Sequence, residues 1–79
     1  MRLDKWLSVS RLIKRRTVAQ EACDGGHVSV SGRVAKPSTD VKVGDVIEIR
    51  FGAKTLRAEV LSVQEAVKKD DAAAMYREL

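Results

Sequence analysis

The sequence predicts a small α+β domain, in which two packed helices lie on a short, mostly antiparallel sheet and a short helix follows at the C-terminus. Three observations predict this class. Apolar residues recur with helical spacing near the N-terminus, apolar and polar residues alternate from residue 27 onward, and glycines separate the alternating segments. A chain of 79 residues is expected to form a single domain, with little room for a deep catalytic pocket.

The first helix is predicted by Leu3, Trp6 and Leu7, which fall on one face at helical spacing. Trp6 is expected to anchor the core, and stacking on a base is the less favoured alternative. Asp4 lies near the start of this helix, where the helix dipole favours an anion. Residues 8–16 then link the first helix to the second.

The second helix is expected to begin near Thr17. The run TVAQ at residues 17–20 has the pattern of a capping box, with a hydroxyl at the N-cap and a glutamine three residues later. Small residues one turn apart, including Ala19 and Cys23, predict a narrow face that a neighbouring helix can approach closely. Gly25-Gly26 is expected to end the helix, because glycine tolerates the left-handed conformation of a C-terminal cap.

The strands follow as two pairs. Residues 27–30 and 33–35 flank the turn signal Ser31-Gly32, and this arrangement predicts a hairpin. Residues 46–51 and 55–63 alternate more cleanly and predict two longer strands with one apolar face, which the helices should cover. The side chains expected on that inner face are Ile47, Ile49, Phe51, Leu56, Ala58 and Val60.

The C-terminal segment, residues 68–79, has high helix propensity around its three consecutive alanines. Asp70 and Asp71 favour the start of a helix there, and we expect it to be loosely docked or partly frayed. The predicted division of the chain is therefore a folded domain with its small sheet at 1–63 and a tail at 64–79.

Positive charge is concentrated at one end of the chain. Residues 1–16 have a net charge of +5 and the remainder has −1, which together give +4. A localised cationic patch on a small domain usually faces a polyanion, and the alternative is a solvated charged face that binds nothing. The six cations of this segment are Arg2, Lys5, Arg11, Lys14, Arg15 and Arg16.

Structured RNA is the favoured polyanion. The only aromatic residues, Trp6, Phe51 and Tyr76, all fall on apolar patterns, so a stacking platform for single-stranded bases is disfavoured. Recognition through backbone and shape suits folded RNA. A DNA-reading helix is disfavoured because the second helix carries Glu21 and Asp24 and has no cation after its first turn.

The sequence offers little chemistry for catalysis. Its only histidine, His27, is expected at an exposed strand end, and its only cysteine, Cys23, is expected to be a packed thiol. Neither a phosphate-binding glycine loop nor metal-ligand spacing occurs. We therefore expect no enzyme activity, metal or cofactor. The lone cysteine suits a reducing cytoplasm, and neither a signal peptide nor a membrane-spanning segment is expected.

Six short motifs lie along residues 1–51, namely RLDKWL at 2–7, SRL at 10–12, RRT at 15–17, GHVSVSG at 26–32, AKPS at 35–38 and VGD at 43–45. Together they resemble the S-four-type RNA-binding domain, also called the alpha-L motif. That resemblance implies the fold predicted above, with an RNA-binding face made by the first helix, the link and the start of the second helix. In its short length and its C-terminal tail the chain resembles members of the RqcP (YabO) family. Members of the heat-shock family differ in having a longer basic C-terminal extension.

Membership of the RqcP family would imply a cytoplasmic, ribosome-associated role in bacterial ribosome-associated quality control. The implied partners are 23S rRNA of the 50S subunit, the P-site peptidyl-tRNA of a stalled subunit, and RqcH, which drives C-terminal alanine tailing; no membrane and no DNA are implied. The alternatives are a heat-shock-type recycling factor for obstructed 50S subunits, an rRNA assembly factor, and a fragment of an RNA-modifying enzyme.

The same resemblance implies which residues contact RNA. Arg2 and Arg16 come first, and the other cations of residues 1–16 follow. For Arg11, the alternative is a structural role as the partner of Asp4 or Glu21. The complete predicted set is Arg2, Lys5, Arg11, Lys14, Arg15, Arg16, Lys36 and Ser38.

Overall fold

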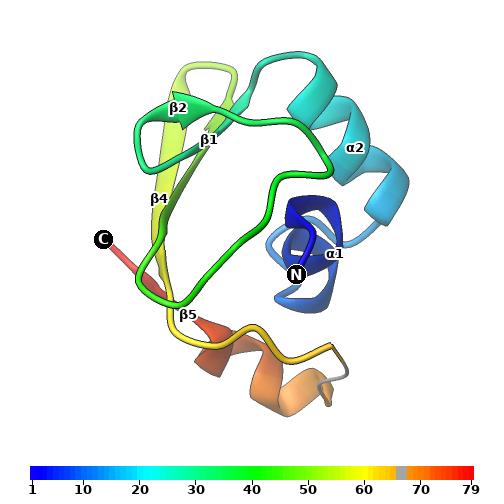
Figure 1. The fold of residues 1–79 in the computed structure, drawn as a ribbon, viewed down its shortest axis with the longest axis vertical. Coiled ribbons are helices and arrows are strands. Elements are labelled where there is room, and N and C mark those ends of the chain that lie inside the picture. The colour runs from blue at the N-terminus through cyan, green and yellow to red at the C-terminus, as the bar shows by residue number, and fades with distance from the viewer. Residues whose placement is uncertain (66–67) are drawn as a thin grey trace.

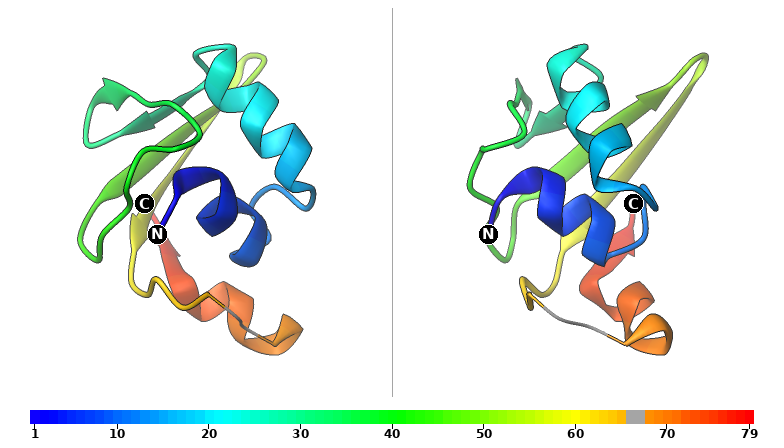
Figure 2. Two further views of the ribbon diagram at one scale, coloured as in Figure 1. Left: turned by 45° about the vertical axis from the view of Figure 1, so that its right-hand side comes forward. Right: turned by 90° about the vertical axis from the view of Figure 1, so that its right-hand side faces the viewer.

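In the residues that the computed structural model describes, 1–65 and 68–79, a five-stranded antiparallel sheet forms one layer, and helices lie against one of its faces. The strand order is β2-β1-β3-β4-β5. Figures 1 and 2 show α1 and α2 side by side on the same side of the sheet, with η1 near the base of the longest strand pair. The elements are α1 (Leu3–Val9), α2 (Arg16–Asp24), β1 (Val28–Val30), β2 (Arg33–Val34), β3 (Val46–Phe51), β4 (Lys54–Val60), η1 (Lys69–Met75, a 3-10 helix) and β5 (Tyr76–Glu78).

The register of the sheet gathers apolar side chains on the inner face. Ile47 pairs with Val30 on one side and Ala58 on the other, while Ile49 pairs with Val28 and Leu56. Because side chains alternate across a strand, these rows share one face. They pack with the fully buried apolar side chains of α1, which are Leu3, Trp6 and Leu7.

The outer face of the sheet is polar. Glu48 forms an ion pair with Arg57 at 3.7 Å, and Glu59 forms one with Arg77. Both pairs lie across neighbouring strands. The expectation of a sheet covered on one face is therefore confirmed. No helix within residues 1–65 and 68–79 has the length and apolar character needed to cross a membrane.

Trp6 has the anchoring role predicted for it. Its side chain is completely buried, and its indole Nε1–H donates to the backbone carbonyl of Ser62 at 2.9 Å. The predicted end of α2 is also confirmed, because Gly26 has a φ of +77° just beyond the helix. At the hairpin turn, Ser31 and Gly32 both have positive φ, at 51° and 85°, as such a turn requires.

The predicted capping box at the start of the second helix is wrong. The helix begins at Arg16, its N-cap is Arg15, and no side chain caps it. Gln20, which was expected to reach back to the helix start, instead donates its side-chain amide to Asp4 at 2.9 Å. The side-chain amide of Gln20, which the capping-box pattern assigned to the helix N-terminus, is therefore hydrogen-bonded to the buried carboxylate of Asp4 on the neighbouring helix.

Two strand predictions need correction. Phe51 lies on the expected face but is 50% exposed, because it stands at the far end of the β3–β4 hairpin. The second long strand ends at Val60 rather than at residue 63. The backbone N–H groups of Leu61 and Ser62 donate instead to the carbonyl of Met75, at 2.8 and 3.2 Å.

The C-terminal segment contains the predicted short helix, but the helix ends at Met75. Residues Tyr76–Glu78 form β5, which pairs with β4, so the helical expectation for the last residues is wrong. Ala72 and Met75 are buried, and the segment is therefore docked rather than loose. The division of the chain between residues 63 and 64 stays a prediction.

Candidate nucleic-acid interface

The carboxylate of Asp4 is the centre of the cationic surface. Its side chain is fully buried. Oδ1 accepts from the backbone N–H of Lys5 at 2.8 Å and from Nε of Arg2 at 3.2 Å. Oδ2 accepts from Nε2 of Gln20 at 2.9 Å and from Nε of Arg16 at 3.3 Å. One carboxylate thus joins the residue before α1 to two positions on α2.

Asp4 remains ionised in this position. Burial alone would raise the pKa of its carboxyl group, because it disfavours the charged form. Hydrogen bonds from Gln20, Arg16, the Lys5 backbone and Arg2 outweigh that effect and lower the pKa below its ordinary value. The surface therefore contains a permanent buried anion that attracts two guanidinium groups.

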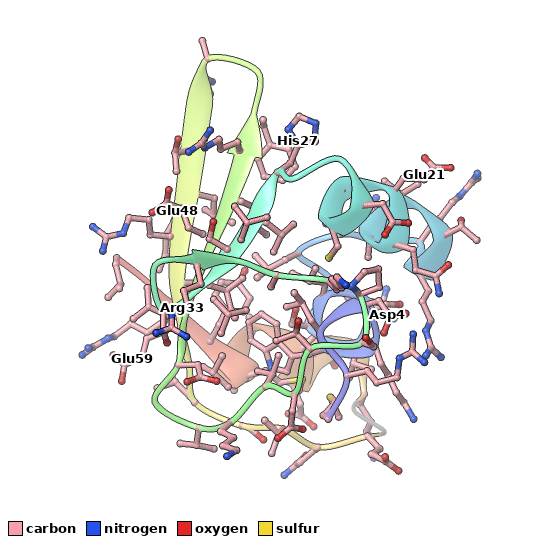
Figure 3. All side chains as sticks on the ribbon, turned by 45° about the horizontal axis from the view of Figure 1, so that its top comes forward. Asp4, Glu21, His27, Arg33, Glu48 and Glu59 are labelled. Atoms are coloured by element: carbon pink, nitrogen blue, oxygen red, sulfur yellow. The ribbon has the colours of Figure 1, made fainter. Side chains whose placement is uncertain are left out.

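The guanidinium groups of Arg2 and Arg16 bind Asp4 with only some of their N–H groups, and both side chains are partly exposed to solvent. Arg16 uses Nε on Asp4, and Arg2 uses Nε together with a longer contact from Nη2 at 3.4 Å. The side chain of Arg2 is nevertheless 53% exposed, and that of Arg16 is 45% exposed. The remaining N–H groups of each planar fork are free to meet an external anion. Figure 3 shows Asp4 on the helical side of the molecule, away from Glu48 and Glu59 on the sheet.

A turn at residues 36–39 completes this surface. The carbonyl of Thr39 accepts from the N–H of Leu3 at 2.8 Å, and that of Pro37 accepts from the N–H of Asp4 at 3.1 Å. These bonds satisfy N–H groups that the start of a helix leaves without partners. They also bring the exposed residues Lys36 and Ser38 beside the start of α1. Figure 1 shows the connection between β2 and β3 passing close to α1.

The other predicted cations are placed differently. Lys5 is half-buried, with its Nζ 3.8 Å from a carboxylate oxygen of Glu65. Arg11, Lys14 and Arg15 lie exposed on the link between the helices, and within the described residues no ion pair involves them. These three charges are therefore directed to solvent.

Arg11 has a structural role different from the one considered as its alternative. It is not the partner of Asp4 or Glu21, because Asp4 is paired with Arg2 and Arg16. Instead, its backbone adopts a φ of +62°, and its N–H donates to the carbonyl of Ser8 at 3.1 Å. This left-handed residue ends the first helix and turns the chain into the link.

The two residues that sequence reasoning failed to place in the site are Asp4, as its organiser, and Gln20. The signal for Asp4 was present, since it lies one turn before Leu7 on the buried side of a short helix. A carboxylate in such a place needs donors from elsewhere in the fold. No comparable signal marked Gln20, whose partner is sixteen positions away in the chain.

Cys23 and His27 have the environments expected for them. Cys23 is buried on the inner face of α2. Burial, together with the charges of Asp4 and Asp24, raises the pKa of its thiol to about 11. His27 is exposed just before β1. Neither side chain forms a reactive pair with the other.

The chain matches the S4 domain over residues 1–47, more than half of its length. The chain belongs to the S4 domain family. In this S4 protein all eight predicted RNA-contacting residues fall within the matched segment, whereas β4, η1 and β5 lie beyond it. The predicted fold class is confirmed by this match and by the sheet and helices described above.

Relatives that match nearly the whole chain identify a more specific family within the S4 domain proteins. The "RQC P-site tRNA stabilizing factor" of Streptococcus pneumoniae is 59% identical over 76 residues, covering 96% of this chain and 86% of that protein. The protein of the same name from Bacillus subtilis is 53% identical, covering 96% of this chain and 88% of that one. The S4 protein therefore belongs to this narrower family too, and the resemblance to the RqcP family is confirmed.

A solved structure supports the fold independently. Heat Shock Protein 15 of Vibrio cholerae superposes with a TM-score of 0.91 at 34% identity, covering all of this chain and 81% of that one. The S4 protein thus shares its backbone arrangement with a heat shock protein, and its function must be argued from its own surface and from its sequence relatives.

Proposed function

We propose that this S4 protein is a non-catalytic RNA-binding factor of ribosome-associated quality control, which stabilises tRNA in the P site of a stalled large ribosomal subunit. The observation that carries the proposal is the Asp4 cluster, in which one buried anion holds two half-exposed arginines on the most basic part of the chain. The name shared by its full-length relatives supports the specific role.

The binding surface would consist of α1, the link, the start of α2 and the turn at 36–39. Arg2 and Arg16 would donate their free N–H groups to phosphate oxygens, and Lys5, Lys36 and Ser38 would flank them. Arg11, Lys14 and Arg15 would meet the same or a neighbouring RNA strand. Each neutralised phosphate releases counterions, so affinity should fall steeply with salt.

The factor would act by holding the tRNA in place and would catalyse no reaction itself. Contact with 23S rRNA and with P-site peptidyl-tRNA at once would hold the tRNA in place while RqcH adds alanines to the nascent chain. The environments of Cys23 and His27 support this view, since the thiol is buried and has a raised pKa and the imidazole is exposed. Such a protein would work on ribosomal subunits in the cytoplasm.

The proposal is tested by binding to purified 50S subunits that carry peptidyl-tRNA and to vacant 50S subunits. We expect tighter binding to the loaded subunits, with log K falling against log salt at a slope of roughly −3 to −4 for four or five neutralised phosphates. In cells, deletion should abolish alanine tails. Equal affinity for the loaded and vacant subunits would contradict a role at the P-site tRNA.

A second candidate is a recycling factor for obstructed 50S subunits that works without tailing. The close superposition on Heat Shock Protein 15 favours it. The two candidates differ in their dependence on RqcH. If the protein still rescued stalled subunits in cells lacking RqcH, the recycling function would be supported and the tailing function contradicted.

A further inference from the structure

The Asp4 cluster contains two residues that are badly placed to contact RNA themselves. The side chain of Asp4 is fully buried and carries the same sign of charge as a phosphate. Gln20 is half-buried and directs its amide inward, 2.9 Å from Oδ2 of Asp4. Both residues nevertheless lie in direct contact with each other and with the arginines on which the proposed function rests.

The hydrogen bonds define where the arginine forks point. Nε of Arg2 is held to one carboxylate oxygen at 3.2 Å, and Nε of Arg16 to the other at 3.3 Å. A guanidinium held through Nε keeps N–H groups in its plane for a second partner. Gln20 shares Oδ2 with Arg16, so its amide restricts where Arg16 can lie.

We propose that Asp4 and Gln20 are positioning residues, which orient Arg2 and Arg16 before RNA arrives and so create a paired phosphate-binding site. The inference rests on the proposed function, because it assumes that these arginines bind RNA. Long side chains lose rotational freedom when they bind, and that cost is smaller if they are already held in the bound orientation. Orientation, and not only charge, then sets the affinity.

A model based on arginine orientation and a model based on net charge predict opposite changes in RNA affinity for Asp4→Asn. The substitution removes a negative charge next to the RNA, so a surface that works by net charge alone should bind more tightly. A surface that depends on held arginines should bind less tightly, because an amide replaces the acceptor of two guanidinium groups. We expect affinity for loaded 50S subunits to fall by about tenfold, the size of one lost charge-assisted hydrogen bond.

The matched control is Asp40→Asn, which changes net charge by the same amount on the same surface. Asp40 is 63% exposed and pairs with the N-terminal amine at 2.8 Å. Its backbone forms a β-bridge with that of Arg2, but among the described residues no hydrogen bond or ion pair joins its side chain to either arginine fork. This variant should bind as well as the unmodified protein, or slightly better. Wild-type or improved affinity for both variants would overturn the inference while leaving the proposed function intact.

Gln20→Met provides a test that leaves net charge unchanged. Methionine is similar in length but cannot donate to Asp4. We expect affinity to fall a few-fold while the salt slope stays the same, because the number of cations facing phosphate is unchanged. Gln64→Met, at an exposed glutamine, should change neither quantity. If Asp4→Asn does not fold, unchanged affinity in Gln20→Met overturns the inference.

Arginine side-chain NMR of the free protein gives a readout that needs no RNA. The Nε–H groups of Arg2 and Arg16 should exchange with solvent more slowly than those of Arg11 and Arg15, which lie on the exposed link. Gln20→Met should speed exchange at Arg16. Equal exchange at all four arginines would overturn the inference, whereas failure of the unmodified protein to bind any 50S subunit would overturn the proposed function as well.

Discussion

Nε of Arg16 lies 3.3 Å from Oδ2 of Asp4, and this ion pair joins α2 to α1 across a separation of twelve residues in the chain. The Arg16 side chain is nevertheless 45% exposed. Arg16 therefore belongs both to the contact between the helices and to the surface that we propose binds RNA. A change at this position should be visible in two separate measurements.

Arg16→Ala should reduce affinity for loaded 50S subunits by roughly tenfold and make the salt slope less steep by about one. It should also lower the free energy of unfolding by about 1 kcal/mol, because Asp4 loses one of its donors. Arg57→Ala is the control, since Arg57 pairs with Glu48 on the opposite face of the sheet. Equal losses of affinity in both variants would show that total charge, rather than this site, governs binding.

The stability of the protein should decline in acid partly through Asp4. Because the folded state lowers the pKa of this carboxyl group, Asp4 contributes stability above its pKa in the unfolded chain, about 4. That contribution is lost as the pH falls through the lower pKa of the folded state. Urea unfolding of wild type and Asp4→Asn should therefore differ most near neutral pH and converge in strong acid. A difference that grows in acid would contradict the assigned direction.

Trp6→Phe should destabilise the protein by about 1–3 kcal/mol. The substitution removes the indole N–H that donates to the carbonyl of Ser62. Because the Trp6 side chain is fully buried, the smaller phenyl ring also leaves a cavity in the core. Phe51→Leu is a suitable control because Phe51 is 50% exposed and should cost much less. Urea unfolding followed by circular dichroism measures both, and equal costs would contradict the anchoring role of Trp6.

Cys23 should resist thiol reagents in the folded protein. The side chain is 3% exposed, and its pKa is raised to about 11, so little thiolate is present at pH 8. We expect labelling by a disulfide reagent at pH 8 to be slow and to accelerate with urea concentration as the protein opens. Rapid labelling without urea would show that α2 separates easily from the core.

The sequence was most informative where a residue's environment depends on its own element. Trp6 in α1 and Ile47 and Ile49 in β3 were placed correctly by spacing alone, because one face of each element is buried. Gln20 was misplaced, since its partner lies on another helix. Tyr76 was assigned to a helix by the propensity of the preceding alanines, but pairing opposite Val60 in β4 decides its conformation.

In the candidate site, too, features set by the local sequence were predictable, whereas features set by contacts between elements were not. The six cations of residues 1–16 were singled out by the charge distribution, whereas Lys36 and Ser38 were added through the family resemblance. The anion that orders these charges was assigned only a local role at a helix end. Charge density is visible in a sequence, whereas the contacts that orient each charge arise from packing two helices and a distant turn.

The turn that caps α1 has a consequence for biosynthesis. The N–H groups of Leu3 and Asp4 bond to carbonyls of Thr39 and Pro37, and a helix of seven residues is too short to persist alone in water. While the protein is being translated, its basic N-terminal segment emerges well before those carbonyls. A nascent chain thus carries all six N-terminal cations before the proposed binding site exists. If that proposal holds, the chain would distinguish one RNA from another only after the turn at residues 36–39 has folded against α1.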